Sequence, residues 1–491
     1  MTLRLRLGHQ DRSWPELFKA ARVYRKLRAL VDADLLNQNA DGWTIENLLA
    51  GFLSHKDVEH WKYRDEGPPP GTRQVSSPAG FRGTAGWAVA TAAPPGSFAT
   101  HSVIYATNES VGRTWISDES VRAASLDNRS GAYEQHGSAQ AAARRSADAL
   151  AACVAQELKV DLFVTSRPYL HAVSWALGRG VTYCQPAGAL ALVSLYLRGQ
   201  GEYLVWKDPD SASSASFNKG LFYWVGAREL LPAGWRWFSA CVNHSYSTGA
   251  VRGSSELVGL GGAVSQRVTR VLQARDDLLR AVNRRQDNDV AEDALIALDA
   301  CLIFLMGAID ATARVAHRVL DLPLTRIHQA KWQNPAWLAN VAARAPDLAA
   351  IVAEETAGAD ALTIVRLLRN TVHDAGLTAL AVGLPPRREA TLASLPDADK
   401  DRILASADRN GGIEEWGLQE LIPGRLHADP ATLLERLLPA TIKLLNDLMN
   451  ATPVEDLPGA SLTPDKLGPP HERNSPFGER ERLSIRWQLG L

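Results

Sequence analysis

The chain has 491 residues, of which 46% are hydrophobic and 22% are charged. This length predicts two or three domains, each with a core of its own. The formal net charge of −1 excludes a protein that attracts nucleic acid through its overall charge, so any such site must be a local basic patch. The four cysteines lie far apart with no Cys-x-x-Cys pair, which indicates buried, reduced thiols in a cytoplasmic protein: Cys153, Cys184, Cys241 and Cys301.

The sequence predicts no membrane segment. Residues 1–7 have no apolar stretch long enough for a signal peptide. The most hydrophobic run, 300–309, is about ten residues long and is bounded by Asp299 and Asp310, which makes it too short to cross a bilayer. We therefore expect a cytoplasmic protein with no membrane partner.

The first hundred residues mix helical and extended patterns. Apolar residues at helical spacing predict a helix within 14–36 and a second helix over 42–63, which Thr44 would cap. Two runs with strand composition follow at 86–91 and 101–107, with Gly, Pro and Ser between them.

The clearest pattern lies between residues 139 and 197, where helices alternate with short apolar strands. The expected elements are a helix over 139–158, a strand over 160–165, a helix over 168–177, a strand over 180–184 and a helix over 187–197. Such alternation is typical of an α/β domain with a parallel sheet. We place this domain at residues 1–210, because Asp, Ser and Ala predominate from 207 to 216.

An aromatic-rich connector over 211–256 follows the α/β domain. Its aromatic residues predict a hairpin or a packing layer between the two halves of the protein. Arg228 and Arg236 are interleaved with them, so the same stretch could stack on the bases of single-stranded RNA, although such clusters more often belong to a core.

From residue 257 to residue 450 the pattern predicts a helical bundle. Its long helices are expected over 257–285, 290–320 and 430–450. The part at 383–420 is polar and is expected to be irregular. Residues 451–491 form a Pro- and Gly-rich extension, in which 483–487 could add one edge strand.

One helix of this bundle carries an unusual polar stripe. Four polar residues fall within an arc of about 100° on a helix that is otherwise apolar: Arg366, Arg369, Asn370 and His373. Unpaired charge on a buried helix is costly, so we expect acidic neighbours, a second subunit or a phosphate to pair with it. Asp299 and Asp310 are the acidic candidates.

Two interpretations of the stripe remain open. In the functional one, arginine stabilises the charge that builds up on a phosphate, and His373 acts as general acid or base near neutral pH. In the structural one, the stripe only forms ion pairs within the bundle.

Residues 257–450 resemble the HEPN superfamily, through the long early helix pair and the late segment Leu368-Arg-Asn-x-x-His-Asp. Ribonucleases of this superfamily carry an arginine, about four to six further residues and then a histidine. Six residues separate Arg366 from His373, and three separate Arg369 from His373, so both arginines stay candidates. The resemblance implies metal-independent RNA cleavage at a homodimer interface, with Asn370 orienting a neighbour or the phosphate, in a toxin or phage-defence setting.

The α/β half resembles the second half of a PIN-like nuclease domain, through the helix with Ser146-Ala-Asp148, the strand that ends at Thr165, and Gly180 to Pro186. The resemblance implies acidic residues at the strand ends that hold Mg²⁺ or Mn²⁺ and activate water.

Asp148 and Asp32 are the candidate metal ligands, with Glu119 or Glu109 as a third acid. Arg167 stands where the family has its last acid, which favours a degenerate or scaffolding domain.

The fold class expected is thus α/β followed by all-α, and three functions are carried forward. The first is an endoribonuclease working through the stripe. The second is a non-catalytic sensor or interaction protein that binds nucleotide or RNA. The third is a metal-dependent PIN-type nuclease working through Asp148 and Asp32.

Overall fold

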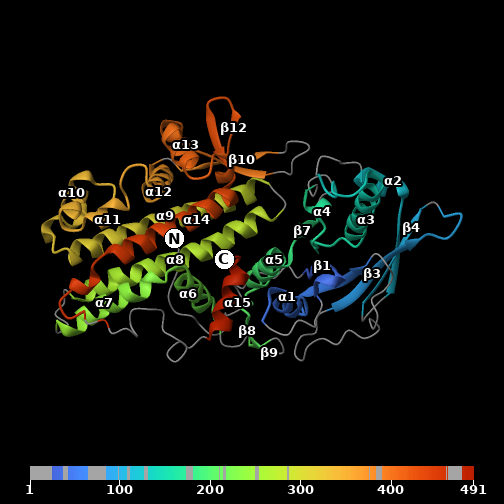
Figure 1. Ribbon diagram of the computed structural model, residues 1–491, viewed down its shortest axis with the longest axis horizontal. Coiled ribbons are helices and arrows are strands. Elements are labelled where there is room, and N and C mark those ends of the chain that lie inside the picture. The colour runs from blue at the N-terminus through green and yellow to red at the C-terminus, as the bar shows by residue number, and fades with distance from the viewer. Residues whose placement is uncertain are drawn as a thin grey trace, which may run out of the picture.

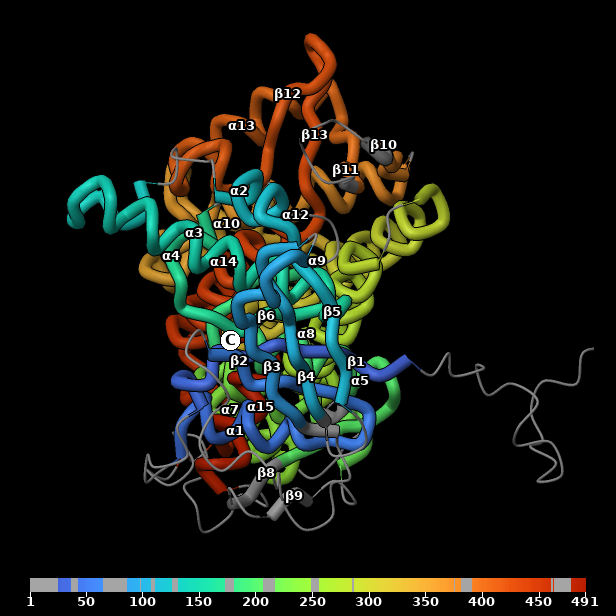
Figure 2. The backbone as a smooth tube through the Cα atoms, turned by 90° about the vertical axis from the view of Figure 1, so that its right-hand side faces the viewer, coloured from blue at the N-terminus to red at the C-terminus, as the bar shows by residue number. Residues whose placement is uncertain are grey.

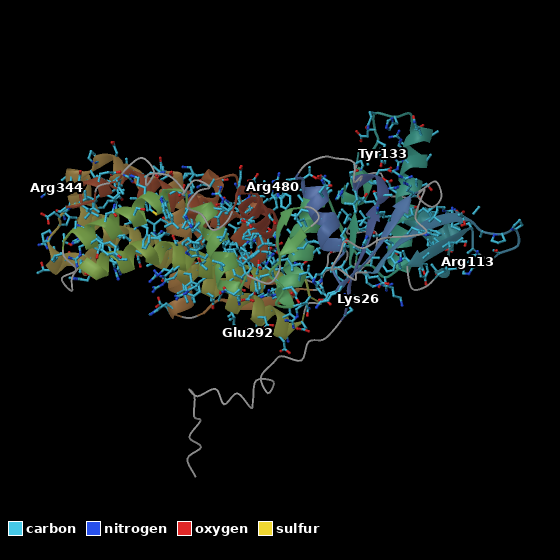
Figure 3. The ribbon with its side chains drawn as sticks, turned by 90° about the horizontal axis from the view of Figure 1, so that it is seen from below. Lys26, Arg113, Tyr133, Glu292, Arg344 and Arg480 are labelled. Atoms are coloured by element: carbon cyan, nitrogen blue, oxygen red, sulfur yellow. The ribbon has the colours of Figure 1, made fainter. Side chains whose placement is uncertain are left out.

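The computed structural model describes residues 25–36, 43–64, 84–97, 99–107, 111–125, 131–172, 181–208, 211–213, 217–248, 254–284, 287–374, 376–382, 390–460, 462 and 478–491. It joins an α/β unit to a long helical bundle, and a small antiparallel sheet lies beside the bundle (Figure 1). Seen from below, Arg344 marks the far end of the bundle, while Tyr133 and Arg113 lie in the α/β unit (Figure 3). The expected class, α/β followed by a largely helical half, is confirmed.

The α/β unit is built on seven strands in the order β5-β4-β3-β2-β1-β6-β7. The strands are β1 (Leu27–Asp32), β2 (Val58–Arg64), β3 (Thr84–Ala92), β4 (His101–Thr107), β5 (Val111–Ile116), β6 (Leu162–Val164) and β7 (Thr182–Cys184). Strands β3, β2, β1, β6 and β7 are parallel to one another. Strand β4 runs antiparallel to both of its neighbours, β3 and β5. The chain passes from β1 to β2 on one side and returns to β6 on the other, so a topological switch point lies between β1 and β6.

Helices cover both faces of this sheet. One face packs against α2 (Asp118–Ser125), α3 (Ser138–Glu157) and α4 (Pro168–Ala172), and the other against α1 (Ile45–Leu53) and α5 (Pro186–Gly199). Successive side chains of a strand point to opposite faces, and in β1 Leu30 joins the first core while Ala29 and Val31 join the second. A strand buried on both sides is a continuous apolar run, as expected for a parallel sheet.

The bundle is organised around two long antiparallel helices, α8 (Ser254–Val282) and α9 (Asn288–Val319). The helices packed around them are α6 (Lys219–Leu230), α7 (Ala233–Ser247), α10 (Pro335–Arg344), α11 (Pro346–Ala350), α12 (Ala357–Asp374) and α14 (Pro430–Ala451). Among the described residues, α9 is the one helix long and apolar enough to cross a membrane, and 61% of its apolar window is buried inside the structure. The core helix of a water-soluble bundle has the same properties.

The C-terminal helix α15 (Glu479–Leu489) returns to the junction between the two halves. There the buried Arg198 of α5 donates to Asp276 Oδ2 of α8 at 2.6 Å and to the Gln488 carbonyl at 3.1 Å. Tyr223 of α6 donates to the same Asp276 oxygen at 2.6 Å. One buried ion pair therefore ties the α/β unit to the bundle and to α15.

The small sheet has four antiparallel strands in the order β10-β11-β13-β12. They are β10 (Thr378–Val382), β11 (Ala390–Ser394), β12 (Leu418–Ile422) and β13 (Arg425–Ala428), accompanied by α13 (Lys400–Arg409). Figure 2 shows this sheet at the top of the molecule, above α12. Strands β8 (Val205–Asp208) and β9 (Ser211–Ser213) form a separate two-stranded sheet. Short 3-10 helices cover Ala33–Leu36, Leu324–Gln329, Asp397–Asp399, Glu414–Trp416 and Val454–Asp456.

Several expectations were wrong, for physical reasons. The stretches 27–32 and 58–63 were expected to be helical but are strands β1 and β2. Periodicity misassigns them because a short strand buried on both faces has no alternation of apolar and polar residues. The irregular segment 383–420 holds β11, β12 and α13 in its described part.

Two further stretches are helical where strands were considered. The hairpin alternative for 217–250 is replaced by α6 and α7, which pack on α8. The edge strand considered at 483–487 is part of α15. The part of the first expected helix at 14–24 lies outside the described residues.

Candidate functional site

The carboxyl ends of β1 and β6 meet at the switch point of the parallel sheet. Asp32 is the last residue of β1, and Thr165 follows β6 directly. The Thr165 hydroxyl donates to Asp32 Oδ2 at 2.5 Å, which fixes the two strand ends against each other. Ligands of open α/β sheets bind at this edge, so the switch point is the first place to look for a site.

Arg167 lies between two carboxylates at this edge. Its Nη2 is 3.1 Å from Asp32 Oδ1, and its Nη1 is 3.2 Å from Asp148 Oδ1. The Tyr133 hydroxyl donates to the second oxygen of Asp148 at 2.6 Å. The PIN-like resemblance implies an Asp that opens this helix, but Asp148 lies in the middle of α3.

The residues at this edge do not fit a divalent cation. The guanidinium stands between Asp32 and Asp148 and donates N–H groups to the oxygens that would have to bind Mg²⁺ or Mn²⁺. Glu119, a candidate third acid, is exposed in the first turn of α2, and Glu109 lies outside the described residues.

A different group within the described part of the chain has the spacing of metal ligands. His55, Asp57 and Glu202 each offer one ligand atom, and these atoms lie within 4.8 Å of one another. His55 and Asp57 precede β2, so the group lies at the opposite edge of the sheet from Asp32. The Lys56 ammonium is 3.6 Å from the Glu202 carboxylate and would compete with a cation there.

The polar stripe of α12 opens onto a cavity of about 280 Å³. Its lining combines α9, the segment before α10, and α12: Met306, Asp310, Lys331, Gln333, Arg366, Arg369 and Asn370. The helix is fixed from its other side, where Ile364, Leu367 and Leu368 are buried in the bundle core. The cavity is therefore a rigid feature with three cations in its wall.

Positive charge is in excess around this cavity. Lys331, Arg314, Arg267 and Arg369 all act to lower the pKa of Asp310, but burial is the larger effect and raises it. Five cations have no carboxylate oxygen within 4.0 Å among the residues that the structure describes: Arg267, Arg314, Lys331, Arg366 and Arg369. Among the described residues, Asp310 is the one acid in the lining, and Asp399 acts on Arg366 from outside it, so the structural interpretation leaves positive charge in excess.

Three polar atoms around the cavity are buried and have no hydrogen-bond partner in the part of the chain that the structure describes: Asp310 Oδ1, Gln333 Oε1 and Arg366 Nε. Burial lowers the pKa of Arg366, and the nearby Arg402 lowers it further. Unmet donors and acceptors of this kind are costly unless a ligand or solvent satisfies them.

A glycine brings Arg267 close to the cavity. A Cβ atom at position 307 would lie 1.5 Å from Arg267 Nη1, so the guanidinium lies directly against the backbone of α9 at Gly307. Position 307 is one turn from Asp310 on the same helix. A side chain at this position would therefore displace the Arg267 guanidinium from the surface of α9.

His373 lies at the exposed end of α12. Its side chain is 70% exposed, so the site is not buried as a whole, contrary to expectation. Nδ1 is 2.9 Å from Asp374 Oδ1. His373 follows Arg369 by four residues, which places it on the same face about 6 Å further along the helix.

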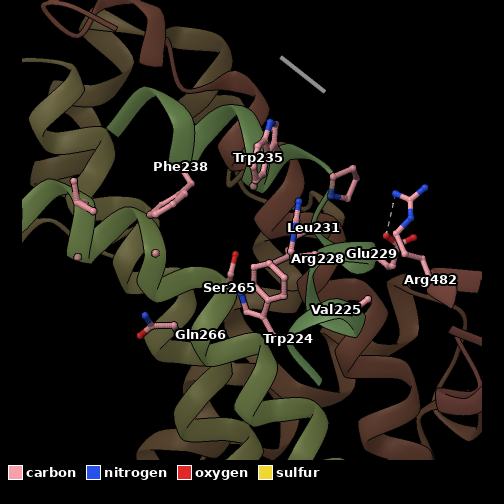
Figure 4. Close-up of a pocket in the computed structure, with 15 residues that line it drawn as sticks. Trp224, Val225, Arg228, Glu229, Leu231, Trp235, Phe238, Ser265, Gln266 and Arg482 are labelled. Atoms are coloured by element: carbon pink, nitrogen blue, oxygen red, sulfur yellow. Dashed lines mark ion pairs between the residues drawn. The ribbon is translucent and has the colours of Figure 1, made fainter. Parts of the chain in front are cut away.

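The two arginines of the connector have different surroundings. Arg236 donates to Glu455 Oε1 at 2.5 Å and to the Met449 carbonyl at 3.0 Å, so it holds the end of α14 and is occupied structurally. Arg228 lies between the rings of Trp224 and Trp235, at 4.6 and 4.7 Å from their centroids, in the wall of a second cavity (Figure 4).

The sequence identified Arg366, Arg369 and Asn370 because one helix carries them. It missed Lys331 and Gln333, which line the cavity from the segment before α10, and Arg267 of α8, which lies against Gly307 and close enough to Asp310 to lower its pKa. The arginines of α8 are a signal that could have found Arg267, but Lys331 and Gln333 have no such signal in the sequence. No protein-family model, no curated protein and no solved structure matches the chain.

Proposed function

We propose that the chain is a metal-independent endoribonuclease whose site is the basic cavity on α12. The observation that carries the proposal is the group of five cations without a carboxylate partner among the described residues, together with an exposed histidine on the helix face that carries Arg366 and Arg369. The HEPN-like identity of the bundle and the toxin or phage-defence setting are parts of the same proposal.

The excess charge favours a phosphate ligand. One guanidinium group can donate two parallel hydrogen bonds to two oxygens of a phosphate. Lys331 adds a third positive charge to the lining. A cavity of about 280 Å³ has room for one phosphate and its sugar. Phosphate contacts give affinity without sequence preference, which suits a site that holds the RNA backbone.

Cleavage would follow from the geometry of His373. A carboxylate only accepts hydrogen bonds, so Asp374 holds the imidazole with its proton on Nδ1 and leaves Nε2 as the base. Nε2 takes the proton of an RNA 2′-hydroxyl, whose oxygen attacks the adjacent phosphorus. The bond to the 5′-oxygen breaks and leaves a 2′,3′-cyclic phosphate. Arg369 and Arg366 stabilise the charge that grows on the phosphate oxygens.

The leaving 5′-oxygen needs a proton, and we propose that a second copy of the chain supplies it. The side chains of His373 and Asp374 are 70% and 76% exposed, so this end of α12 is accessible to another molecule. A homodimer that pairs the two helices would bring a base and an acid to the same phosphate.

The α/β unit has a supporting role in this proposal. Arg167 forms ion pairs with both Asp32 and Asp148 and occupies the space between them, which argues against a metal-dependent PIN-type nuclease at that edge. The four cysteines are buried and unpaired, which fits a reducing compartment such as the cytoplasm. A non-catalytic RNA-binding sensor is the second candidate, because the same cations would serve binding alone.

The test is cleavage of labelled single-stranded RNA in EDTA by the wild type, His373→Ala and His328→Ala. His328 is also exposed and lies outside the cavity, so it is the matched control. The proposal expects cleavage by the wild type and His328→Ala and none by His373→Ala. RNA binding without cleavage would favour the sensor, and cleavage that needs a metal and survives His373→Ala would favour the third function.

A further inference from the structure

A second cavity, of about 320 Å³, lies between α6, α7 and α8, away from the α12 site. Figure 4 shows the rings of Trp224, Trp235 and Phe238 around it, with Ser265 and Gln266 on the α8 side. Its walls are mainly aromatic and aliphatic, with a few polar groups at the edges. Small-molecule sites of proteins share this size and composition.

Arg228 is held rigidly in the wall of this cavity. Its guanidinium lies between two indole rings, 4.6 Å from Trp224 and 4.7 Å from Trp235, and such stacking fixes its plane. It has no hydrogen bond or ion pair within the described residues, although its N–H edge offers several donors. Burial lowers its pKa, and Glu229 only partly compensates.

A second cation with an unmet donor lines the same cavity. Arg482 of α15 is 3.6 Å from Glu229, and its buried Nε has no hydrogen-bond partner among the residues with a described position. Two arginines and one glutamate leave one positive charge in the lining. The complementary ligand therefore carries one negative group.

Glycines keep the α8 side of the cavity open. A Cβ atom at Gly259 would meet nothing within 4 Å, and one at Gly262 would meet the Phe238 ring at 3.4 Å. The helix surface between them can thus face a flat molecule that also contacts the aromatic wall.

We propose that this cavity binds a small, planar aromatic molecule that carries one carboxylate or phosphate. The ring lies against the aromatic wall over Gly259, and the anionic group accepts hydrogen bonds from the fixed edge of Arg228. The proposal is independent of RNA cleavage, because none of its residues belongs to the α12 site.

Isothermal titration of the full chain with 1-naphthoate and with adenosine 5′-monophosphate tests the proposal. The neutral 1-naphthamide is the ligand control. We expect at least one of the two anions to bind. If 1-naphthoate binds, the neutral 1-naphthamide should bind at least tenfold more weakly. The tighter anion identifies the source as an aromatic acid or a nucleotide.

Two substitutions assign the binding to this cavity. Gly259→Leu should lower the affinity at least tenfold by filling the cavity, while Gly259→Ala, which adds one methyl group into open space, should change it less than threefold. Arg228→Gln should remove the preference for the anion. Thermal unfolding of each variant checks that the fold is intact. Binding of neither anion, or binding that folded Gly259→Leu leaves unchanged, would overturn the proposal.

Discussion

Asp32 at the end of β1 and Asp148 in the middle of α3 share one guanidinium, that of Arg167. The three side chains are between 5% and 15% exposed, so this is a largely desolvated ion triad. Thr165 and Tyr133 satisfy the remaining carboxylate oxygens. The arrangement stabilises the switch point and leaves its carboxylates without the free oxygens that a catalytic cation needs.

Removing Arg167 should destabilise the α/β unit. Arg167→Ala leaves two buried carboxylates facing each other, and breaking a buried pair in this way costs about 3 kcal/mol or more in the free energy of unfolding. Urea denaturation measures the loss. Arg284→Ala is the control, because Arg284 and Asp293 form an exposed pair, and such pairs contribute less than about 1 kcal/mol.

The same variant should gain affinity for a divalent cation. Without the guanidinium, Asp32 and Asp148 can both bind Mn²⁺, so 1 mM MnCl₂ should raise the melting temperature of Arg167→Ala and leave that of the wild type unchanged. An equal Mn²⁺ effect on both proteins would place the bound ion elsewhere, with His55, Asp57 and Glu202 as the first candidates.

The ion pair between Arg198 and Asp276 should be essential for the connection of the two halves. Asp276→Asn leaves the fully buried guanidinium unpaired and should lower the free energy of unfolding by about 4 kcal/mol. The double variant Arg198→Met with Asp276→Leu removes both charges and should recover most of that loss, as urea denaturation would show. A double variant as unstable as the single one would mean that the hydrogen bonds to Gln488 and Tyr223 carry the effect.

His60 should make stability fall at acidic pH. Burial lowers its pKa from 6.5 to about 4, so the unfolded chain binds a proton that the folded chain does not between these values. The free energy of unfolding is therefore unaffected by His60 above pH 6.5 and falls by about 3 kcal/mol in all as the pH is lowered towards 4. The difference between the wild type and His60→Gln in urea midpoints from pH 7 to pH 4 measures this loss, and parallel curves would contradict it.

Gly307→Ala separates RNA binding from stability. The added methyl group displaces Arg267 from α9, so affinity for single-stranded RNA should fall about threefold to tenfold, the loss of roughly one phosphate contact. Alanine is the better helix former by about 1 kcal/mol, so the melting temperature should not fall by much. Fluorescence anisotropy at two salt concentrations measures the affinity, and an unchanged salt dependence would exclude Arg267 from the site.

The sequence predicted those elements whose pattern is local. Helix α3, strands β6 and β7, and helix α5 alternate in composition, and α14 begins at Pro430, the residue where the sequence places its start. Strand β1 was missed because its burial on both faces comes from β2 and β6 and from the helices around them, which no local period records.

The residues of the candidate sites also fall into those that local spacing groups and those that only tertiary packing brings together. Arg366, Arg369 and Asn370 share a helix face, so spacing alone groups them. Lys331 and Arg267 join them only through the packing of α8, α9 and α12. The sequence identified Arg167 as a departure from the PIN-like pattern, but its bridge between Asp32 and Asp148 depends on β1 lying beside β6.

The most direct test of RNA cleavage at the α12 site uses an oligodeoxynucleotide with one ribonucleotide, incubated with the protein in EDTA. The account predicts one cut, directly 3′ of the ribonucleotide, with a 2′,3′-cyclic phosphate end, and no cut by His373→Ala. Cutting of the all-deoxy strand, or cutting at the ribonucleotide that His373→Ala retains, would contradict it.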